Sequence, residues 1–534
     1  MALSATRLGR RVHCPITRPA RALVLGLVLV SLLNPVEGRA QRLSIAVAAR
    51  IQTLDPYQQA EPDQAGVLAH LYDALTRFDA RQRLLPGLAT AWRSIGDRTW
   101  QFELRRGARF HDGTRLEAAD VVASLDAARD APALARHLQG TTTAVIDDFT
   151  IQVRTDQPNP LLPNALSFVP ILSRHSIERP ESAPLGTGPF RLVRLEAGDR
   201  LQLAANAAYW GVKPAWSELV IRFVDEAERR VELLRDRQVD LIAAPGASAL
   251  AGLRADPSLR VQQRISTRLI YLQMDQARDE TSYVQGLDGA PLPNPLKDRR
   301  VREALSLAID RDALASGLLA GTAIKTAQLM PPGLPGYSTR IDAPGYDPEG
   351  ARALLEQAGL GQGFVLTLHG PQDHYRMGRE VLRLIGQMLL RVGIRTQVSS
   401  MPKSVYFKRA SRGGNDGSPE FSMMLLGWTS DSGDALDALN AFVHGFDKSR
   451  RLGLVNRGRY RNPRVDELIE AANATLARDK RRALLELASE IALNERAVLP
   501  LYHEVNTWVS RSGIDYVPRM DGRTYALDAR RERD

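Results

Sequence analysis

Apolar and polar residues alternate with a period of two in several short segments after residue 40. This pattern is typical of strands that bury one face. It predicts strands at 42–47, 99–104, 149–154, 190–195, 201–203 and 219–224. A more continuously apolar stretch at 268–274 predicts a further strand. Up to about residue 275, therefore, strands are expected to dominate.

One helix is predicted inside this strand-rich part. The motif FHDG at 110–113 indicates a tight turn, because Asp-Gly pairs favour chain reversal. Thr114 and Glu117 then have the spacing of a capping box, in which two side chains bond the first N–H groups of a helix. The predicted helix begins there and buries Val121, Val122, Leu125 and Ala128.

Helical and strand periods alternate from about 295 to 400, which predicts an α/β lobe. Asp298 can cap one helix, and Asp347 followed by Pro348 starts another. An apolar helical stripe between 381 and 389 separates predicted strands at 364–368 and 394–398. Later segments predict helices at about 463–477 and 479–495, followed by a strand at 498–502.

The first forty residues have the features of a secretory signal peptide. An arginine-bearing start precedes an apolar run at 22–33, the breaker pair Asn34-Pro35 and a small-x-small site at 38–40. The run has twelve residues, whereas a membrane span needs about 20. The alternative is an uncleaved amphipathic helix, and the run has no polar face to favour it. Cys14 precedes the run, so it is not placed as a lipoprotein cysteine.

Composition favours a folded, exported protein of several domains. The 534 residues exceed one hydrophobic core, and 44% are hydrophobic and 25% charged. The formal charge is +10, but residues 1–40 hold six arginines and one acid, so their removal leaves 65 basic and 60 acidic residues. Without basic runs interleaved with aromatics, nucleic acid is not an expected partner. The predicted mature chain has no cysteine, which suits an oxidising compartment, and we expect a soluble periplasmic protein.

A collinear set of motifs resembles the dipeptide/oligopeptide (peptide/nickel) solute-binding family of ABC importers. The strongest match runs from 88 to 122 and includes the strand, FHDG turn and helix described above. Shorter matches follow in the family's order: LDP at 54–56, GTGPF at 186–190, YWGVKP at 209–214, RVREAL at 300–305, AIDR at 308–311, GW at 427–428 and NP at 462–463. The resemblance extends over essentially all of 41–534.

The resemblance implies an α/β fold of two lobes that close around a ligand, the Venus flytrap architecture, with mixed sheets flanked by helices. Lobe I would comprise 41–265, with an inserted subdomain at about 56–185, and lobe II would comprise 266–499. Residues 500–534 would return to lobe I, and crossing strands near 270–274 and 499–502 would form the hinge. The implied partners are a small peptide-like ligand and a membrane ABC permease. A monomer without cofactor or catalytic activity is expected.

Asp431 is the leading candidate for ligand binding. It follows the apolar stretch 421–426 on a Ser/Gly-rich turn, a position from which a carboxylate can enter a cleft. In the peptide binders that the sequence resembles, an aspartate here receives the α-ammonium of the ligand. A buried ammonium needs an opposite charge, and such a bond contributes about 1.5–3 kcal/mol. The alternative is that Asp431 only binds amides of its own turn.

Two aromatic residues and a glycine complete the first group of candidates. Trp428, with Gly427 beside it, can form the floor of a pocket that accepts varied side chains, although tryptophans are also common core residues. Tyr57 follows LDP, where relatives bring the chain to the cleft, but it can equally pack on the surface.

Charged candidates for a ligand carboxylate are less well defined. The motif GPQDHY at 370–375 resembles a segment of relatives that carries an arginine where this chain has His374, next to Tyr375. A solvated histidine is the alternative at that position. Arg457 or Arg459, beside Gly458, can supply the missing guanidinium, or both can simply solvate a loop.

Two other function classes remain open. Some relatives bind nickel or metal chelates, for which His369, His374 and His503 are the candidate ligands. Their spacing is weak support, and no resident metal is predicted. A secreted hydrolase is the remote alternative, because the sequence has no Gly-x-Ser-x-Gly, P-loop or His-Glu-x-x-His motif.

Overall fold

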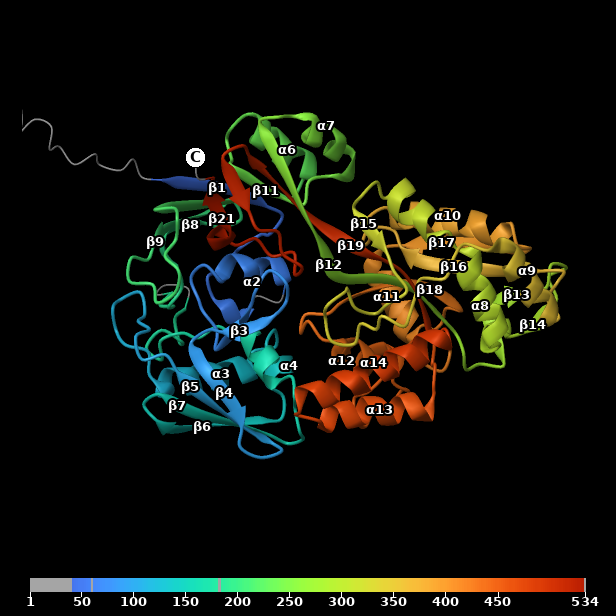
Figure 1. Ribbon diagram of the computed structural model, residues 1–534, viewed down its shortest axis with the longest axis horizontal. Helices are drawn as coiled ribbons and strands as arrows, with labels where there is room; N and C mark the ends of the chain where they lie inside the picture. The colour runs from blue at the N-terminus through green and yellow to red at the C-terminus, as the bar shows by residue number, and fades with distance from the viewer. Residues whose placement is uncertain (1–40, 59–60, 181–183, 533–534) are drawn as a thin grey trace, which may run out of the picture. The chain divides into compact units, whose positions relative to one another are not determined.

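Two long antiparallel strands, β12 (Leu259–Met274) and β19 (Val498–Arg511), form the centre of the largest sheet. The structure is a computed structural model that describes residues 41–58, 61–180 and 184–532. The pairing of the two strands shifts register between Ile265/Leu269 and Ile270/Tyr271. Figure 1 shows both strands running between two groups of elements. We call these groups lobe I and lobe II.

The main sheet extends into both lobes from this central pair. On the lobe I side it continues through β11 (Leu241–Ala243), β1 (Arg42–Val47), β10 (Glu218–Phe223), β9 (Arg200–Ala205) and β8 (Phe190–Glu196). On the lobe II side it continues through β18 (Met423–Thr429), β16 (Phe364–Pro371), β13 (Glu280–Gln285) and β14 (Pro291–Pro293). β17 (Ile394–Met401) joins β16 in parallel, and β15 (Ala323–Lys325) joins β19.

Lobe I carries a second sheet with its own helix cover. Four antiparallel strands take the order β4 (Ala89–Ser94), β5 (Thr99–Leu104), β7 (Thr150–Thr155) and β6 (Thr141–Asp147). The remaining strands of the lobe are β2 (Thr76–Phe78), β3 (Leu84–Pro86), β20 (Ile514–Tyr516) and β21 (Ala529–Arg531). Its helices are α2 (Pro62–Leu68), α3 (Ala118–Asp130), α4 (Ala135–Leu138), α5 (Leu162–Ala165), α6 (Ala227–Arg235) and α7 (Leu250–Ala255).

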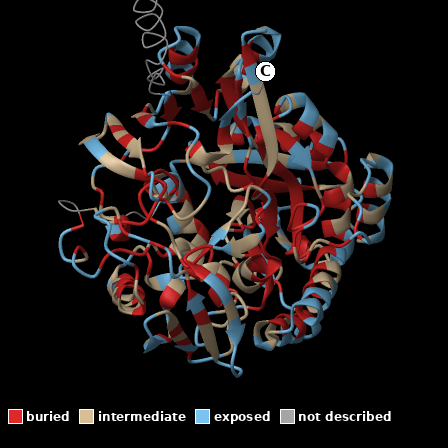
Figure 2. Ribbon diagram, turned by 60° about the vertical axis from the view of Figure 1, so that its left-hand side comes forward, coloured by how far each residue is buried: buried red, intermediate tan, exposed pale blue. Residues whose placement is uncertain are grey.

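Helices also flank the main sheet in lobe II. They are α8 (Arg299–Ala308), α9 (Pro348–Gln357), α10 (Gly378–Leu390), α11 (Lys403–Arg412), α12 (Ala435–Ala438), α13 (Pro463–Ala474) and α14 (Arg478–Asn494). Figure 2 shows buried residues on the strands and the inner faces of helices, with exposed residues on the outer faces. Sheet and helices therefore bury their apolar faces against each other.

Strand β12 separates two hydrophobic cores in lobe II. Ile270 and Leu272 pack in one core, whereas Leu269 and Tyr271 pack in the other. Successive side chains of a strand point to opposite faces, so both faces of β12 are buried here. This explains why the part of the strand from Leu269 to Leu272 is continuously apolar and does not alternate. The same strand that connects the lobes is thus anchored by packing on both sides.

Most predicted elements are confirmed, but the capping box at Thr114 is wrong. Helix α3 begins at Ala118, with Glu117 as its N-cap, and the Asp120 carboxylate accepts a hydrogen bond from the Glu117 backbone N–H at 3.0 Å. Thr114 instead donates to Asp112 within the preceding turn. The box therefore lies three residues later than predicted. The helix caps at Asp298 and Asp347 are confirmed.

The predicted signal peptide lies outside the described residues. Within the residues that are described, no helix is long and apolar enough to cross a bilayer. The predicted lobe boundaries stay predictions, although Arg519 and Met520 of the C-terminal segment bond Phe78 and Ala80 of lobe I.

Candidate functional site

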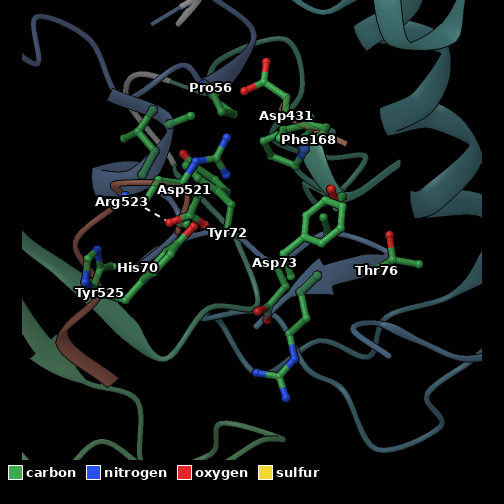
Figure 3. Close-up of a pocket in the computed structure, with 18 of the residues that line it drawn as sticks. Pro56, His70, Tyr72, Asp73, Thr76, Phe168, Asp431, Asp521, Arg523 and Tyr525 are labelled. Atoms are coloured by element: carbon green, nitrogen blue, oxygen red, sulfur yellow. Dashed lines mark hydrogen bonds between the residues drawn. The ribbon is translucent and has the colours of Figure 1, made fainter. Parts of the chain in front are cut away.

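A pocket in lobe I is lined by residues from segments 56–78, 133–170, 189–209 and 519–528 of the chain, and Asp431 of lobe II contributes to it. Its volume is about 190 Å³, somewhat above the ~150 Å³ that accommodates a benzene ring. Figure 3 shows side chains from the helix α2 region, from the loop at Phe168 and from the C-terminal segment around this space. Its size fits one side chain or head group of a ligand.

The loop that carries Asp431 is fixed by a buried ion pair. Asp434 accepts a hydrogen bond from the Leu436 N–H at 3.0 Å and so caps α12. Its other carboxylate oxygen lies 2.6 Å from the Arg481 guanidinium of α14, and both side chains are at most 10% exposed. The turn after β18 is therefore held against the helices of lobe II.

A second aspartate, Asp437 of α12, binds the same loop. Asp437 accepts hydrogen bonds from the hydroxyls of Ser430 at 2.9 Å and Ser432 at 2.7 Å. Burial raises the pKa of Asp437 to about 7, while these hydroxyls act in the opposite direction. Asp434 is thus paired with α14 and Asp437 with the serines of the loop, whereas Asp431 lines the edge of the pocket (Figure 3).

Asp431 lies in an electrostatically mixed environment. Burial raises its pKa, whereas the guanidinium groups of Arg523 and Arg136 lower it. The nearest of these contacts is 3.9 Å, between Arg136 and the Asp431 carboxylate. At that distance on a partly exposed surface the contact is weak, so the carboxylate remains available to a ligand cation.

The Asp431 loop also contacts lobe I. The Asn164 side-chain amide of α5 donates to the Ser432 carbonyl at 2.9 Å. Gly433 has a φ of +66° and lies against Gln82, whose carbonyl oxygen would be 3.1 Å from a Cβ at this position. A side chain is disfavoured there by both the backbone conformation and the space. The loop therefore bridges the two lobes beside the pocket.

An aromatic wall continues from this contact into the pocket. Phe168 stacks on His137, with ring centroids 5.0 Å apart, and the Arg523 guanidinium lies 5.1 Å from the Phe168 centroid. Burial lowers the pKa of His137 to about 4, which keeps this ring neutral at pH 7. The wall thus offers apolar faces for packing and a guanidinium for an anion.

His70 supports the opposite side of the pocket. Its Nδ1 lies 2.9 Å from the Val67 carbonyl, and the Ala526 backbone N–H donates to its Nε2 at 2.9 Å. The ring is therefore a neutral Nδ1–H tautomer. Burial lowers its pKa to about 4. His70 joins the α2 region to the C-terminal segment and shapes the pocket without carrying charge.

Sequence comparison identifies the family that has this architecture. Residues 83–450 match the bacterial extracellular solute-binding proteins, family 5, middle region. The chain belongs to this family. It is therefore a solute-binding protein of the ABC-importer class.

Individual relatives agree with this assignment. The family 5 chain is 26% identical to the dipeptide-binding protein of Escherichia coli K12, over 86% of this chain and 91% of that protein. It is 28% identical to the glutathione-binding protein of the same strain, over 87% and 89%. The structure of HbpA2 from Haemophilus parasuis superposes with a TM-score of 0.79 at 22% identity, covering 92% of this chain and all of that one. This likeness confirms the predicted two-lobe α/β fold.

Other predicted site residues of the family 5 protein lie near one another in lobe II. The Gly427 backbone N–H donates to the Tyr375 hydroxyl at 2.7 Å. A Cβ at Gly427 would lie 2.8 Å from the Tyr375 ring, so the glycine permits this contact. Trp428 is partly buried and meets Phe442 edge to face at 5.6 Å. It packs on the lobe II core directly before the Asp431 loop.

His374 and Arg457 both approach Phe407. The exposed His374 ring meets Phe407 edge to face at 5.3 Å, and the Arg457 guanidinium lies 5.8 Å from the same ring. Arg457 also donates to the Ser411 hydroxyl at 3.1 Å. Arg459 instead lies over Phe446. These residues form a second group in lobe II and do not line the pocket that contains Asp431.

Tyr57 is buried in the hydrophobic core of lobe I. Its ring is 7% exposed, and its hydroxyl donates to the Pro170 carbonyl at 3.2 Å. The neighbouring Pro56 and Pro170 line the pocket, whereas Tyr57 itself lies behind them. Its role as a direct ligand contact stays a prediction.

The three candidate metal ligands have separate environments. His369 is buried and stacks on Phe421 at 4.0 Å. His503 is buried on β19 opposite Leu269, and His374 is exposed. Among the described residues no group of three or more His, Cys, Asp or Glu is arranged to hold a metal.

Sequence reasoning missed Arg136, Phe168 and Arg523, which line the pocket with Asp431. Arg136 and Phe168 belong to short elements without strong periodicity, and Arg523 lies near the end of the chain. The one available signal was the turn DGR at 521–523, where Gly522 has a φ of +74° and the Arg523 N–H donates to Asp521 Oδ1 at 3.0 Å.

Proposed function

We propose that this family 5 protein captures a short peptide or peptide-like solute with a free ammonium group and delivers it to the membrane permease. The observation that carries the proposal is the position of Asp431: its two neighbouring aspartates are bonded to Arg481 and to the loop serines, whereas Asp431 lines the pocket. The relatives named dipeptide-binding and glutathione-binding proteins support this ligand class.

Binding energy would come from lobe closure over the ligand. The Asp431 loop already contacts both lobes through Ser432 and Asn164. Closure would remove water from the carboxylate, and an ionic hydrogen bond becomes stronger when water is excluded. The aromatic wall at Phe168 would pack against an adjacent ligand group. Trp428, Gly427 and Tyr375 would form the lobe II side of the cleft.

The remaining expectations complete the proposal. The protein would be exported by its N-terminal signal peptide and act in the periplasm as a monomer. It would bind its solute without chemical change, without a cofactor and without nucleic acid.

The test combines native mass spectrometry of the purified protein with calorimetric titration. A retained ligand would show the class of solute directly. L-Ala-L-Ala should bind, and N-acetyl-L-Ala-L-Ala should not, because acetylation removes the ammonium. Asp431→Asn keeps the side-chain size and should weaken binding by about tenfold or more.

Asp447→Asn is the matched control, because the Asp447 carboxylate accepts hydrogen bonds from Ser449 and Arg450 of its own loop. It should leave the affinity unchanged. Equal affinity for free and acetylated peptides would contradict the proposal. Binding of a nickel–histidine complex without peptide binding would favour a metal-chelate carrier, and peptide cleavage during the titration would favour a hydrolase.

A further inference from the structure

The pocket contains four aspartates, two of which are paired within the protein. Asp521 and Asp528 accept from the Arg519 guanidinium at 2.7 and 3.1 Å. Arg519 is only 6% exposed at its side chain. Both carboxylates are bonded to the same guanidinium, and the three side chains together keep one net negative charge.

A third aspartate is held by neutral donors. Asp73 accepts from the Thr187 hydroxyl at 2.9 Å, the Tyr209 hydroxyl at 3.1 Å and the Trp210 indole at 2.7 Å. Three such bonds use most of the acceptor capacity of one carboxylate. Asp431 is therefore the pocket carboxylate without strong donors, its nearest being Arg136 at 3.9 Å.

Arg523 is the cation of the pocket whose guanidinium has donors left for a ligand. Its stem packs over Gly66, and its guanidinium lies over Phe168. Among the residues that the structure describes, no carboxylate oxygen lies within 4.0 Å of this guanidinium. Tyr525 is its hydrogen-bonding neighbour. A guanidinium has five N–H donors in a planar fork, so several remain for an anion that enters the pocket.

Asp431 and Arg523 belong to one continuous wall. Arg136 connects Asp431 to His137, which stacks on Phe168, which in turn carries Arg523. Figure 3 shows Asp431, Phe168 and Arg523 around the same part of the pocket. An acceptor for a cation and a donor for an anion therefore face one small space.

We propose that Arg523 binds a carboxylate of the ligand that lies next to the ammonium held by Asp431. The preferred ligand class is then a solute with an amino-acid-type head, with ammonium and carboxylate on one carbon, as in a peptide linked through a γ-glutamyl bond. An ordinary α-linked peptide presents an amide at this place and leaves the guanidinium without its anion. The inference rests on the proposed contact between Asp431 and the ammonium.

Two isomeric dipeptides test it on the unaltered protein. γ-L-Glu-L-Ala and α-L-Glu-L-Ala have the same composition and charge, but only the γ-isomer has ammonium and carboxylate on the same carbon. In calorimetric titrations the γ-isomer should bind about tenfold more tightly or better, as expected for one charge-assisted contact. Equal affinities, or a preference for the α-isomer, would overturn the inference while leaving the ammonium contact intact. If neither isomer nor L-Ala-L-Ala binds, the proposed function itself fails.

The variant Arg523→Gln tests whether the preference for the γ-isomer comes from this side chain. The variant should bind the γ-isomer about tenfold more weakly or worse and the α-isomer with less than a threefold change, so the preference disappears. Arg523→Lys keeps the charge without the fork and should restore the preference in part. Arg229→Gln, which removes an exposed arginine paired with Glu232, is the control and should keep the full preference. A γ-preference that persists in Arg523→Gln would exclude Arg523 as the anion-binding residue.

Discussion

The guanidinium of Arg136 lies 3.9 Å from the carboxylate of Asp431 and connects α4 of lobe I to the loop after β18 of lobe II. Arg136 is exposed over 63% of its side chain and Asp431 over 40%. An ion pair in such surroundings contributes between 0 and about 1 kcal/mol. A ligand ammonium that reaches Asp431 would therefore displace a weak partner that already belongs to the protein.

Arg136→Gln should raise the affinity for an ammonium-bearing peptide. The variant removes the competing charge and lowers the cost of displacement, so the expected gain is up to about fivefold at low salt. Titration calorimetry with L-Ala-L-Ala measures it, and the gain should shrink in 0.5 M salt because exposed charges are screened. Arg129→Gln, which removes an arginine paired with Asp126 on α3, should show no gain. Weaker peptide binding by Arg136→Gln would contradict this role.

Asn164→Ala should weaken ligand binding by about two- to tenfold. It deletes the hydrogen bond from Asn164 to the Ser432 carbonyl, which joins the lobes beside Asp431. One such bond contributes about 0.5–1.5 kcal/mol, and the contact is coupled to closure in the proposed mechanism. The control is Asn473→Ala, because Asn473 bonds Asn440 within lobe II. If both variants weaken binding equally, the effect does not come from the contact between lobes.

Arg481→Ala should destabilise the protein strongly. Asp434 would keep its charge in a nearly inaccessible site, and breaking a buried ion pair costs about 3–5 kcal/mol. The loss should appear as a lower midpoint in urea unfolding followed by circular dichroism. The neighbouring Arg482 is exposed and lies 3.7 Å from Glu486, so Arg482→Ala should cost less than about 1 kcal/mol. Similar costs for both variants would show that the Asp434–Arg481 pair is not the anchor of the loop.

The fold was predictable where local pattern and burial agree. Strand β10 forms within one residue of its predicted position, and the carboxylates of Asp298 and Asp347 cap their helices by accepting from the N–H groups of Arg300 and Gly350. At Thr114 the pattern was ambiguous: the threonine bonds Asp112, and Glu117 caps the helix. The hinge strand β12 is longer than its apolar part, because its first half pairs with β19 through polar residues.

The site was only partly predictable, because its residues meet through tertiary contacts. The turn and the family resemblance together predict Asp431 as a site residue, and Asp431 lines the pocket. Arg136 and Arg523 come from segments almost 400 residues apart, and no local pattern relates either of them to Asp431. His374 and Arg457 were expected to serve one ligand group, and both in fact lie beside Phe407. Spacing along a sequence gives little information about such proximity.

His70 should make stability fall in mild acid. Its Nε2 accepts a hydrogen bond from the Ala526 N–H. Protonation of Nε2 would therefore make it a donor that faces the Ala526 N–H donor. Its pKa is lowered by burial to about 4, whereas the pKa of an unfolded histidine is about 6.5. The unfolded state therefore binds the proton first as pH falls, and stability is lost from about pH 6.5 down to pH 4. The full shift corresponds to about 3 kcal/mol.

Comparison of the unaltered protein with His70→Gln isolates this contribution. The variant should be less stable at pH 7.5, because it loses the two hydrogen bonds to Val67 and Ala526. The difference in unfolding free energy between the two proteins should shrink by about 2 kcal/mol by pH 4.5, because only the unaltered protein loses the stability that depends on a neutral His70. Urea unfolding at pH 7.5, 5.5 and 4.5 measures it, with a substitution at an exposed histidine, His175→Gln, as the control. A neutral His70 ring with Nε2 as an acceptor must lose its bond to Ala526 when it is protonated. If the difference in unfolding free energy between the two proteins stays constant across this range, the His70 ring does not couple protonation to unfolding.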